Sequence, residues 1–192
     1  FGGWYADAAC EGDEVTELPG SYPAGTTTYY AKWEASTDTK YTVEYWYQNE
    51  MTGRYAKVSE SPRYDGTTGE SVNVTDADKK PTNEEGNYVL NAEMANEWSA
   101  ICAADGNTVL RVYFKLQYTV TYEAGENGTV EGSLSQTVDW GGDTTEVTAT
   151  ADQGYHFVSW NDNNTNASRS ESGVTADATY TATFAPNEDT KY

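Results

Sequence analysis

The side chains that could do chemistry in this sequence are few and lie far apart. The single histidine, His156, lies inside an aromatic alternation, and the two cysteines are Cys10 and Cys102. Covalent catalysis needs a nucleophile beside a base, and neither cysteine falls in the segment around His156. Adjacent acids such as Glu84-Glu85 are expected by chance among 31 Asp and Glu residues. We therefore predict no enzyme activity, no catalytic residue and no cofactor.

One polar run resembles a cation-binding loop in its spacing. Asp162-Asn163-Asn164-Thr165-Asn166 places oxygen ligands at alternate positions, as a calcium loop does. It lacks the glycine and the distal glutamate of the EF-hand pattern. We prefer a solvated loop to a calcium site here, and we predict no metal.

Two tryptophans, Trp46 and Trp140, are candidate ligand-binding residues. Trp46 lies on the polar side of an alternating stretch, and Trp140 adjoins the turn Gly141-Gly142. An exposed tryptophan can stack on a sugar ring or anchor a protein contact. The alternative is that each ring packs against a neighbouring module, and we prefer this interpretation because scattered exposed apolar residues are common.

Composition limits the classes of partner. The 192 residues carry a formal net charge of −20, from 11 Lys and Arg against 31 Asp and Glu. This balance argues against nucleic acid and against an anionic membrane as partners, because both attract cationic patches. No apolar run approaches the ~20 residues of a membrane span, so we expect no membrane insertion. The 16 Tyr and 6 Trp residues favour strands around an aromatic core.

The sequence contains a divergent internal repeat. Phe1 precedes Trp4 by three residues, as Phe157 precedes Trp160. Each pair is followed by an alternation that ends in an aromatic residue, at residues 29–33 and 180–184. Alternating large and small residues are typical of a strand with one buried face. Such self-similarity indicates a repeat architecture.

Recurring phrases also mark where modules begin. Asp38-Thr39-Lys40-Tyr41 returns as Asp189-Thr190-Lys191-Tyr192, and residues 40–45 are echoed by residues 117–122. We therefore predict a truncated module at residues 1–35, complete modules at residues 41–116 and 118–185, and a linker to a next module at residues 186–192. Since the chain does not begin with Met, we expect it to be part of a longer one. Whether Cys10 and Cys102 pair stays open.

Short strands separated by turns make the expected fold mainly β, with small α+β modules. The strict alternation of residues 41–48 predicts a strand that forms a hairpin with residues 54–59. Asn127-Gly128 predicts a second hairpin turn. Residues 161–172 are expected to be a polar loop, and residues 92–100 are either helix or loop.

Each module contains distinctive motifs. They are Gly154-Tyr-His-Phe-Val-Ser-Trp, Val174-Thr-Ala-Asp-Ala-Thr-Tyr-Thr-Ala-Thr-Phe, Phe1-Gly-Gly-Trp-Tyr, Tyr29-Tyr-Ala-Lys-Trp, Gly66-Thr-Thr-Gly69 and Val109-Leu-Arg-Val-Tyr-Phe-Lys. Through these motifs, residues 118–185 resemble the divergent InlB B-repeat, and residues 1–33 resemble the second half of a Listeria–Bacteroides (InlB B-type) repeat. Residues 41–116 resemble a MucBP-like mucin-binding repeat.

The resemblance implies a secreted or cell-wall-anchored bacterial protein outside the cell, with β-grasp-like modules in an extended rod. Its implied role is a spacer that projects a binding region and contacts neighbouring repeats of its own chain. The alternative is an adhesin module that binds a host glycan, such as mucin, or a matrix protein. Because residues 1–33 lack opening strands, we expect this piece to be frayed or completed by another chain.

Overall fold

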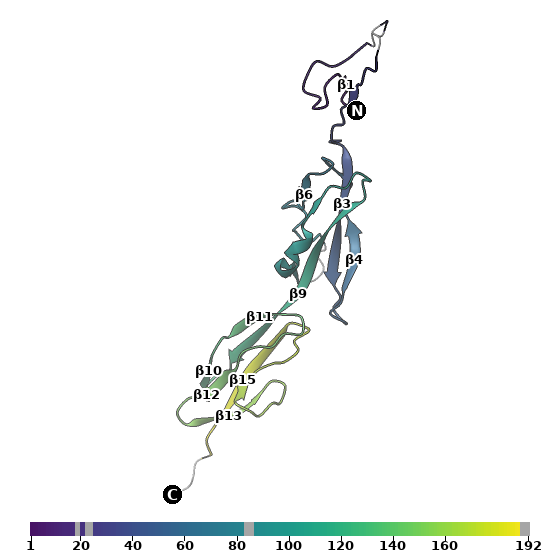
Figure 1. Cartoon of the computed structure of the whole chain (residues 1–192). Coiled ribbons are helices and arrows are strands. Elements are labelled where there is room, and N and C mark those ends of the chain that lie inside the picture. Colours follow the sequence, from purple (N-terminus) through teal and green to yellow (C-terminus); the bar gives the residue numbers. More distant parts are fainter. Residues whose placement is uncertain (18–19, 22–24, 83–86, 189–192) are drawn as a thin grey trace.

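The computed structural model describes residues 1–17, 20–21, 25–82 and 87–188, and the fold is mainly β. Figure 1 shows an N-terminal segment (residues 1–35), a middle module (39–116) and a C-terminal module (117–188) in succession. Among the described residues the one helix is a 3₁₀ helix, η1 (Ala92–Glu97), which answers the open choice for that stretch. Glu84-Glu85 and residues 189–192, which end the expected linker, lie outside the described residues.

The middle module is built around strand β3 (Thr39–Gln48), in which buried and half-exposed residues alternate along the whole length. β3 pairs antiparallel with β4 (Tyr55–Glu60) and β5 (Tyr64–Gly66), so the expected hairpin is confirmed. It pairs in parallel with the first half of β9 (Thr108–Ala124). β9 has a further antiparallel partner in β7 (Tyr88–Leu90).

The core of the middle module lies on one side of this sheet. The buried side of β3 carries Tyr41, Val43, Tyr45 and Tyr47. A second small sheet of β6 (Ser71–Asn73) and β8 (Ser99–Ile101) places Val72 in the same core. The remaining buried members are Val74, Cys102, Leu110, Val112 and Phe114. The fold is thus set by alternation of large apolar residues, as expected for strands with one buried face.

A buried carboxylate lies among the tyrosines of this core. Asp78 is 2% exposed and accepts hydrogen bonds from the hydroxyls of Tyr45 (2.5 Å) and Tyr64 (3.0 Å). Its second oxygen accepts from the amide (2.8 Å) and the hydroxyl (2.7 Å) of Thr75. The group satisfies the rule that a buried charge needs hydrogen-bond donors around it.

The C-terminal module continues from the second half of β9, which pairs in parallel with β15 (Ala178–Pro186) and antiparallel with β11 (Ser135–Asp139). β15 pairs antiparallel with β13 (Tyr155–Trp160). A separate sheet contains β10 (Gly128–Glu131), β12 (Val147–Ala151) and β14 (Ser168–Arg169). The core between them includes Tyr122, Val147, Trp160 and Ala182, which are at most 1% exposed.

The prediction of a hairpin at Asn127-Gly128 is wrong, because the strands on either side of this turn do not pair with each other. Asn127 does adopt a positive φ of 68°, but β10 pairs with β12 and not with β9. The reason lies in tertiary packing. A Cβ atom on Gly128 would lie 2.4 Å from Cζ of Phe184, so the ring of Phe184 takes the space beside this turn. β10 therefore leads into the second sheet. The loop expected over residues 161–172 is also interrupted, by β14.

The N-terminal segment contains one short antiparallel pair, β1 (Trp4–Tyr5) and β2 (Tyr30–Ala31). Its register places Trp4 opposite Ala31, just as Trp160 lies opposite Ala182. The strand expected over the closing aromatic phrase is thus reduced to two residues. Strand β15 has nine residues and lies between two neighbouring strands, β13 and β9. Among the described residues β2 pairs with β1 alone, so it lacks the second neighbour that β15 has.

Candidate functional site

Polar and aromatic contacts between segments far apart in the sequence lie where the middle and C-terminal modules meet. Strand β9 runs through this point without interruption for 17 residues. Its first half is parallel to β3, in a register that ends at Tyr47 opposite Phe114, and its second half is parallel to β15 from Val120 opposite Ala178. The expected boundary between residues 116 and 118 therefore falls inside a single strand.

Trp140 lies at this junction. It follows β11 in the C-terminal module, and its indole N–H donates a hydrogen bond of 2.7 Å to the carbonyl of Glu50 in the middle module. A Cβ atom on Gly53 would lie 2.3 Å from Cζ3 of Trp140, so the ring rests directly on the β3–β4 turn. Gly53 has a φ of +67°, which favours glycine at that turn. This placement corresponds to the inter-module alternative for Trp140.

Ion pairs and hydrogen bonds accompany the Trp140 contact. Lys115 Nζ lies 2.6 Å from Asp139 Oδ2, and the side-chain amide of Gln117 donates to Asp139 Oδ1 at 2.9 Å. Burial alone would raise the pKa of Asp139, but the bonds from Lys115 and Gln117 outweigh it and lower the pKa. The carboxylate therefore stays charged near neutral pH and keeps β11 tied to β9.

Two further contacts connect the modules around β9. Asn87 Nδ2 donates to Asp177 Oδ2 at 3.1 Å. Beside this bond, at the end of the middle module, Gln48 Oε1 accepts from the amide of Leu116 at 3.0 Å. The side chain of Tyr88 packs against the hydrophobic cores of both modules. These residues gave no signal in the sequence, because each is a common polar or aromatic residue with a partner far along the chain.

Trp46 lies elsewhere, on the outward side of β3 in the middle module. Its register partners are Lys57 on β4 and Tyr113 on β9, and the rings of Trp46 and Tyr113 are 6.0 Å apart. Tyr55 contacts Tyr113 edge to face, with ring centroids 5.2 Å apart. The structure thus does not bring Trp46 and Trp140 together; it adds Tyr55 and Tyr113 to the surroundings of Trp46.

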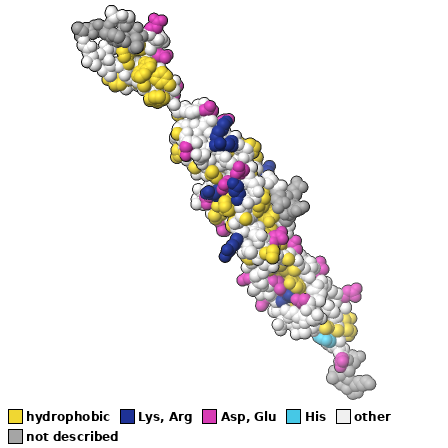
Figure 2. All heavy atoms as spheres, turned by 90° about the vertical axis from the view of Figure 1, so that its right-hand side faces the viewer, with side chains coloured by type: hydrophobic (Ala, Val, Ile, Leu, Met, Phe, Trp, Pro, Cys, Tyr) yellow, Lys and Arg dark blue, Asp and Glu magenta, His cyan; other side chains and the backbone are white. Residues whose placement is uncertain are grey.

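Charged groups flank these aromatic side chains. Glu44 accepts from the Trp46 indole (3.1 Å), and forms ion pairs with Lys57 (3.0 Å) and Arg111 (3.1 Å). Burial acts to raise the pKa of Glu44, but Lys57, Trp46 and Arg111 together lower it. In Figure 2 the Lys and Arg side chains gather over the middle of the molecule. We call Trp46, Tyr55 and Tyr113, with these charged residues, the outer aromatic face.

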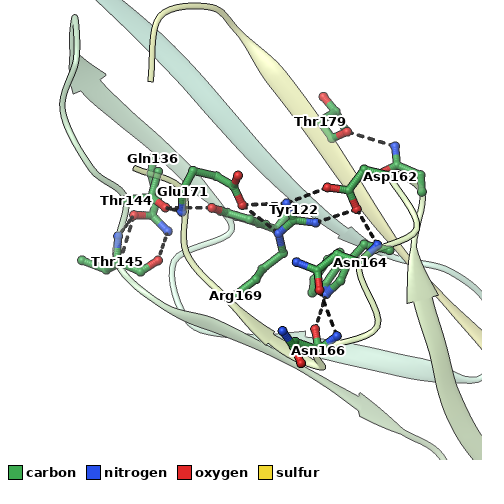
Figure 3. Close-up of polar contacts among 12 residues, drawn as sticks. Tyr122, Gln136, Thr144, Thr145, Asp162, Asn164, Asn166, Arg169, Glu171 and Thr179 are labelled. Carbon is green, nitrogen blue, oxygen red and sulfur yellow. Dashed lines mark hydrogen bonds and ion pairs between the residues drawn. The ribbon is translucent and has the colours of Figure 1, made fainter. Parts of the chain in front are cut away.

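The polar run at residues 162–166 is organised by an arginine (Figure 3). Arg169, whose side chain is 4% exposed, pairs with Asp162 at 3.0 Å and with Glu171 at 2.7 Å. Its guanidinium lies 3.7 Å from the ring centroid of Tyr180. Asp162 and Asn164 also accept from backbone amides two residues further on, as in Asx turns. A useful signal was available in the sequence, since Arg169 is the one Lys or Arg among residues 118–188.

The remaining candidates show no catalytic arrangement in the described part of the chain. His156 is exposed, and its Nδ1 lies 3.2 Å from Oδ1 of Asn187. Cys10 and Cys102 are both free thiols. Within the described ranges no group of three or more His, Cys, Asp or Glu residues could hold a metal ion. No helix in these ranges is long and apolar enough to cross a membrane.

Comparison with known families bears on the C-terminal module. Residues 118–188 match the family model of the divergent InlB B-repeat domain. The C-terminal module carries this repeat. The match covers less than half of the chain, and it confirms the resemblance seen in the motifs around Trp160 and Phe184.

Several solved structures are similar to the chain at low TM-scores. They include the crystal structure of Mub-RV (16% identity, 77% of this chain, 100% of that chain, TM-score 0.26). A type 2 repeat of the mucus binding protein MUB from Lactobacillus reuteri has 16% identity over 74% of this chain and 98% of its own, with a TM-score of 0.23. Streptococcal High Identity Repeats in Tandem domains 3-4 from a cell surface protein have 14% identity, with coverages of 77% and 99% and a TM-score of 0.24. No curated protein matches this chain.

Proposed function

We propose that this chain is a non-enzymatic spacer segment of a bacterial surface protein, whose tandem modules form an extended rod that projects a binding region from the cell. The observation that supports it best is the shared strand β9, which belongs to the sheets of both complete modules. A continuous strand has no flexible linker, so bending at the junction must break strand pairing or the contacts beside it. The modules then transmit position and force along the chain.

Trp140 is the residue whose removal tests this role. Trp140→Ala removes the hydrogen bond to Glu50 and the packing on Gly53, which we expect to cost about 2 kcal/mol of contact between the modules. We expect wider bending at the junction. The measurement is the distance distribution between spin labels at Val58 and Val158, which are 61% and 41% exposed. Cys10 is replaced by serine so that it takes up no spin label. Cys102 can stay because it is buried.

The matched control is Trp46→Ala, which removes an equal ring from the outer face of the middle module. Its distance distribution should equal that of the unchanged protein. If Trp140→Ala also left the distribution as narrow as in the unchanged protein, the ring would not stiffen the junction and the rigid-spacer proposal would lose its main support.

A second candidate function is adhesion through the outer aromatic face. Two observations favour it. Trp46 and Tyr113 form a cross-strand aromatic pair, and Tyr55 contacts Tyr113. The ion pair of Glu44 and Arg111 lies beside these rings. Aromatic rings stack on the apolar faces of sugars, and charged groups beside them can bind hydroxyls or acidic substituents. The ligand class would be a host glycan, such as a mucin oligosaccharide, or a matrix protein.

The test of adhesion is retention of the purified chain on a panel of mucin glycans and matrix proteins. If the face binds, Trp46→Ala should weaken retention about tenfold, or ~1.4 kcal/mol, without lowering the melting temperature. Trp140→Ala should keep the binding and lose stability. If the unchanged protein bound no member of the panel, or if both variants were retained equally, adhesion through this face would be contradicted. The spacer function would then be the remaining proposal.

A further inference from the structure

The strands by which the chain enters and leaves the two complete modules lie side by side. β3 opens the middle module, β9 closes it and opens the C-terminal module, and β15 closes that module. The strand order of their sheet is β13-β15-β9-β3-β4, so these three strands are consecutive and each has a neighbour on both sides. Figure 1 shows them following one another along the length of the molecule. Tension along the chain therefore passes through the central strands of the sheet and not through its edges.

The direction of pairing decides how tension acts on these strands. β3 is parallel to the first half of β9 over seven register pairs, which begin with Tyr41 opposite Thr108. The second half of β9 is parallel to β15 over five register pairs, which begin with Val120 opposite Ala178. Tension pulls each opening strand toward its N-terminal end and each closing strand toward its C-terminal end. Two parallel strands pulled in this way slide past each other, so the hydrogen bonds between them are strained together and not one after another.

Buried side chains oppose sliding in the middle module. Val43 lies opposite Leu110, and these residues are 0% and 1% exposed. Tyr47 lies opposite Phe114, with ring centroids 4.9 Å apart. A slip by one residue would turn the buried side of a strand toward solvent. The core therefore holds β3 and β9 in one register.

The outward side of the same two strands opposes sliding as well. Glu44 lies opposite Arg111 and forms an ion pair with it at 3.1 Å. Trp46 lies opposite Tyr113, with ring centroids 6.0 Å apart. Cross-strand pairs of these kinds stabilise the register in which they form. Both faces of the β3–β9 pair are thus matched to the observed register.

The C-terminal module has the same arrangement. Tyr122 lies opposite Tyr180, and the two rings are stacked 5.9 Å apart. Val120 and Tyr122 are at most 1% exposed. Asp177, immediately before β15, accepts a hydrogen bond of 2.7 Å from the amide of Thr119 on β9. This bond adds to the contacts that sliding of β9 past β15 must break.

We propose that the two complete modules are tension clamps, in which the parallel pairs β3–β9 and β9–β15 keep each module folded while the chain is pulled. The shared strand β9 joins the two clamps in series through its own backbone. This inference rests on the spacer function and adds that the segment withstands tension, as it must when a bound partner is pulled away from the cell. Chain order alone sets entry at β3 and exit at β15, so the path of the tension is the same in any longer chain.

The test compares two directions of pulling on the full chain in single-molecule force measurements. Attachment points are exposed residues changed to cysteine in a Cys10→Ser background, in which the buried Cys102 stays. Asp38→Cys with Glu188→Cys pulls along the chain through both modules. Asp38→Cys with Asn107→Cys pulls at one end of the parallel β3–β9 pair and peels its bonds singly. At equal loading rate we expect each rupture in the first direction to need about threefold more force than rupture in the second, because several bonds must break together.

Two core variants separate the clamp from overall stability. Val43 is on a pulled strand, whereas Val72 is on β6, which pairs with β8 and contributes to the same core. We expect Val43→Ala and Val72→Ala to lower the free energy of unfolding in urea comparably. In the first direction of pulling, only Val43→Ala should lower the rupture force of a module, because a forced transition depends on the contacts that break in it.

Equal rupture forces in the two directions of pulling would overturn the proposal. An equal decrease of the rupture force in Val43→Ala and Val72→Ala would also overturn it, since force would then follow overall stability. The spacer proposal is tested separately, without tension, by the spin-label distances. A narrow distance distribution together with equal rupture forces would retain the spacer and reject the clamp.

Discussion

Replacing Arg169 by methionine is expected to destabilise the C-terminal module by about 2–3 kcal/mol, because it removes a buried cation that bonds two partly exposed acids. Arg169 holds Asp162 and Glu171 at 3.0 and 2.7 Å (Figure 3). Its guanidinium also stacks on Tyr180. Burial acts to lower the pKa of Arg169, but the two acids raise it, so the guanidinium stays charged. Methionine keeps much of the apolar stem and therefore isolates the loss of charge. Urea unfolding followed by circular dichroism measures the effect.

The matched control for Arg169 is Lys57→Met on the outer aromatic face. Lys57 also bridges two acids, Glu44 and Glu60, but its side chain is 39% exposed. Exposed pairs contribute at most about 1 kcal/mol because water screens them. Equal losses of stability for the two variants would show that burial of Arg169 does not matter, contrary to our expectation.

Asp78→Ala is expected to cost about 3–5 kcal/mol in the middle module. The substitution removes the acceptor of Tyr45, Tyr64 and Thr75 together, and leaves two tyrosine hydroxyls without this partner in or beside the core. Asp76→Ala is the control, since the Asp76 side chain is 96% exposed two residues away. A loss below about 1 kcal/mol for Asp78→Ala, or a loss no larger than that of Asp76→Ala, would show that the hydrogen bonds of Asp78 do not stabilise the core.

The same carboxylate makes the middle module sensitive to acid. Burial alone would raise the pKa of Asp78, but hydrogen bonds from Tyr45, Thr75 and Tyr64 outweigh it and hold the pKa below its ordinary value of 3.8. A depressed pKa in the folded state stabilises the protein above pH 3.8, and this contribution is lost as the pH falls through the folded-state value. As the pH falls below 3.8, the free energy of unfolding should therefore decrease less for the Asp78→Ala variant than for the unchanged chain. Equal decreases would show that Asp78 is not the source of the acid sensitivity.

Much of the local structure was predictable from alternation. The buried residues Tyr41, Val43, Tyr45 and Tyr47 follow the period of two that a half-buried strand requires. The motif around Trp160 predicted a repeat, and the match of residues 118–188 to the divergent InlB B-repeat confirms it. These features are local, because one strand carries its whole pattern of buried and exposed positions in consecutive residues.

Pairing between distant segments was not predictable in the same way. Asn127-Gly128 carries the signal of a hairpin turn, yet the next strand pairs with β12, because Phe184 packs beside Gly128. Residues 116–118 suggested a boundary between modules, yet β9 passes through it. In both cases the local sequence allows several partners, and the choice depends on side chains more than fifty residues away.

The candidate site shows the same division. The amino-acid pattern was enough to single out Trp46 and Trp140 among polar neighbours, to predict that strands dominate, and to predict the divergent InlB B-repeat at residues 118–188. The folded chain shows in addition that Trp140 packs on Gly53 across the junction, while Trp46 pairs with Tyr113 on the outer aromatic face. The physical reason is that alternation specifies which side of a strand is apolar, whereas the partner of that side is selected by packing and hydrogen bonding between segments that meet only in the folded chain.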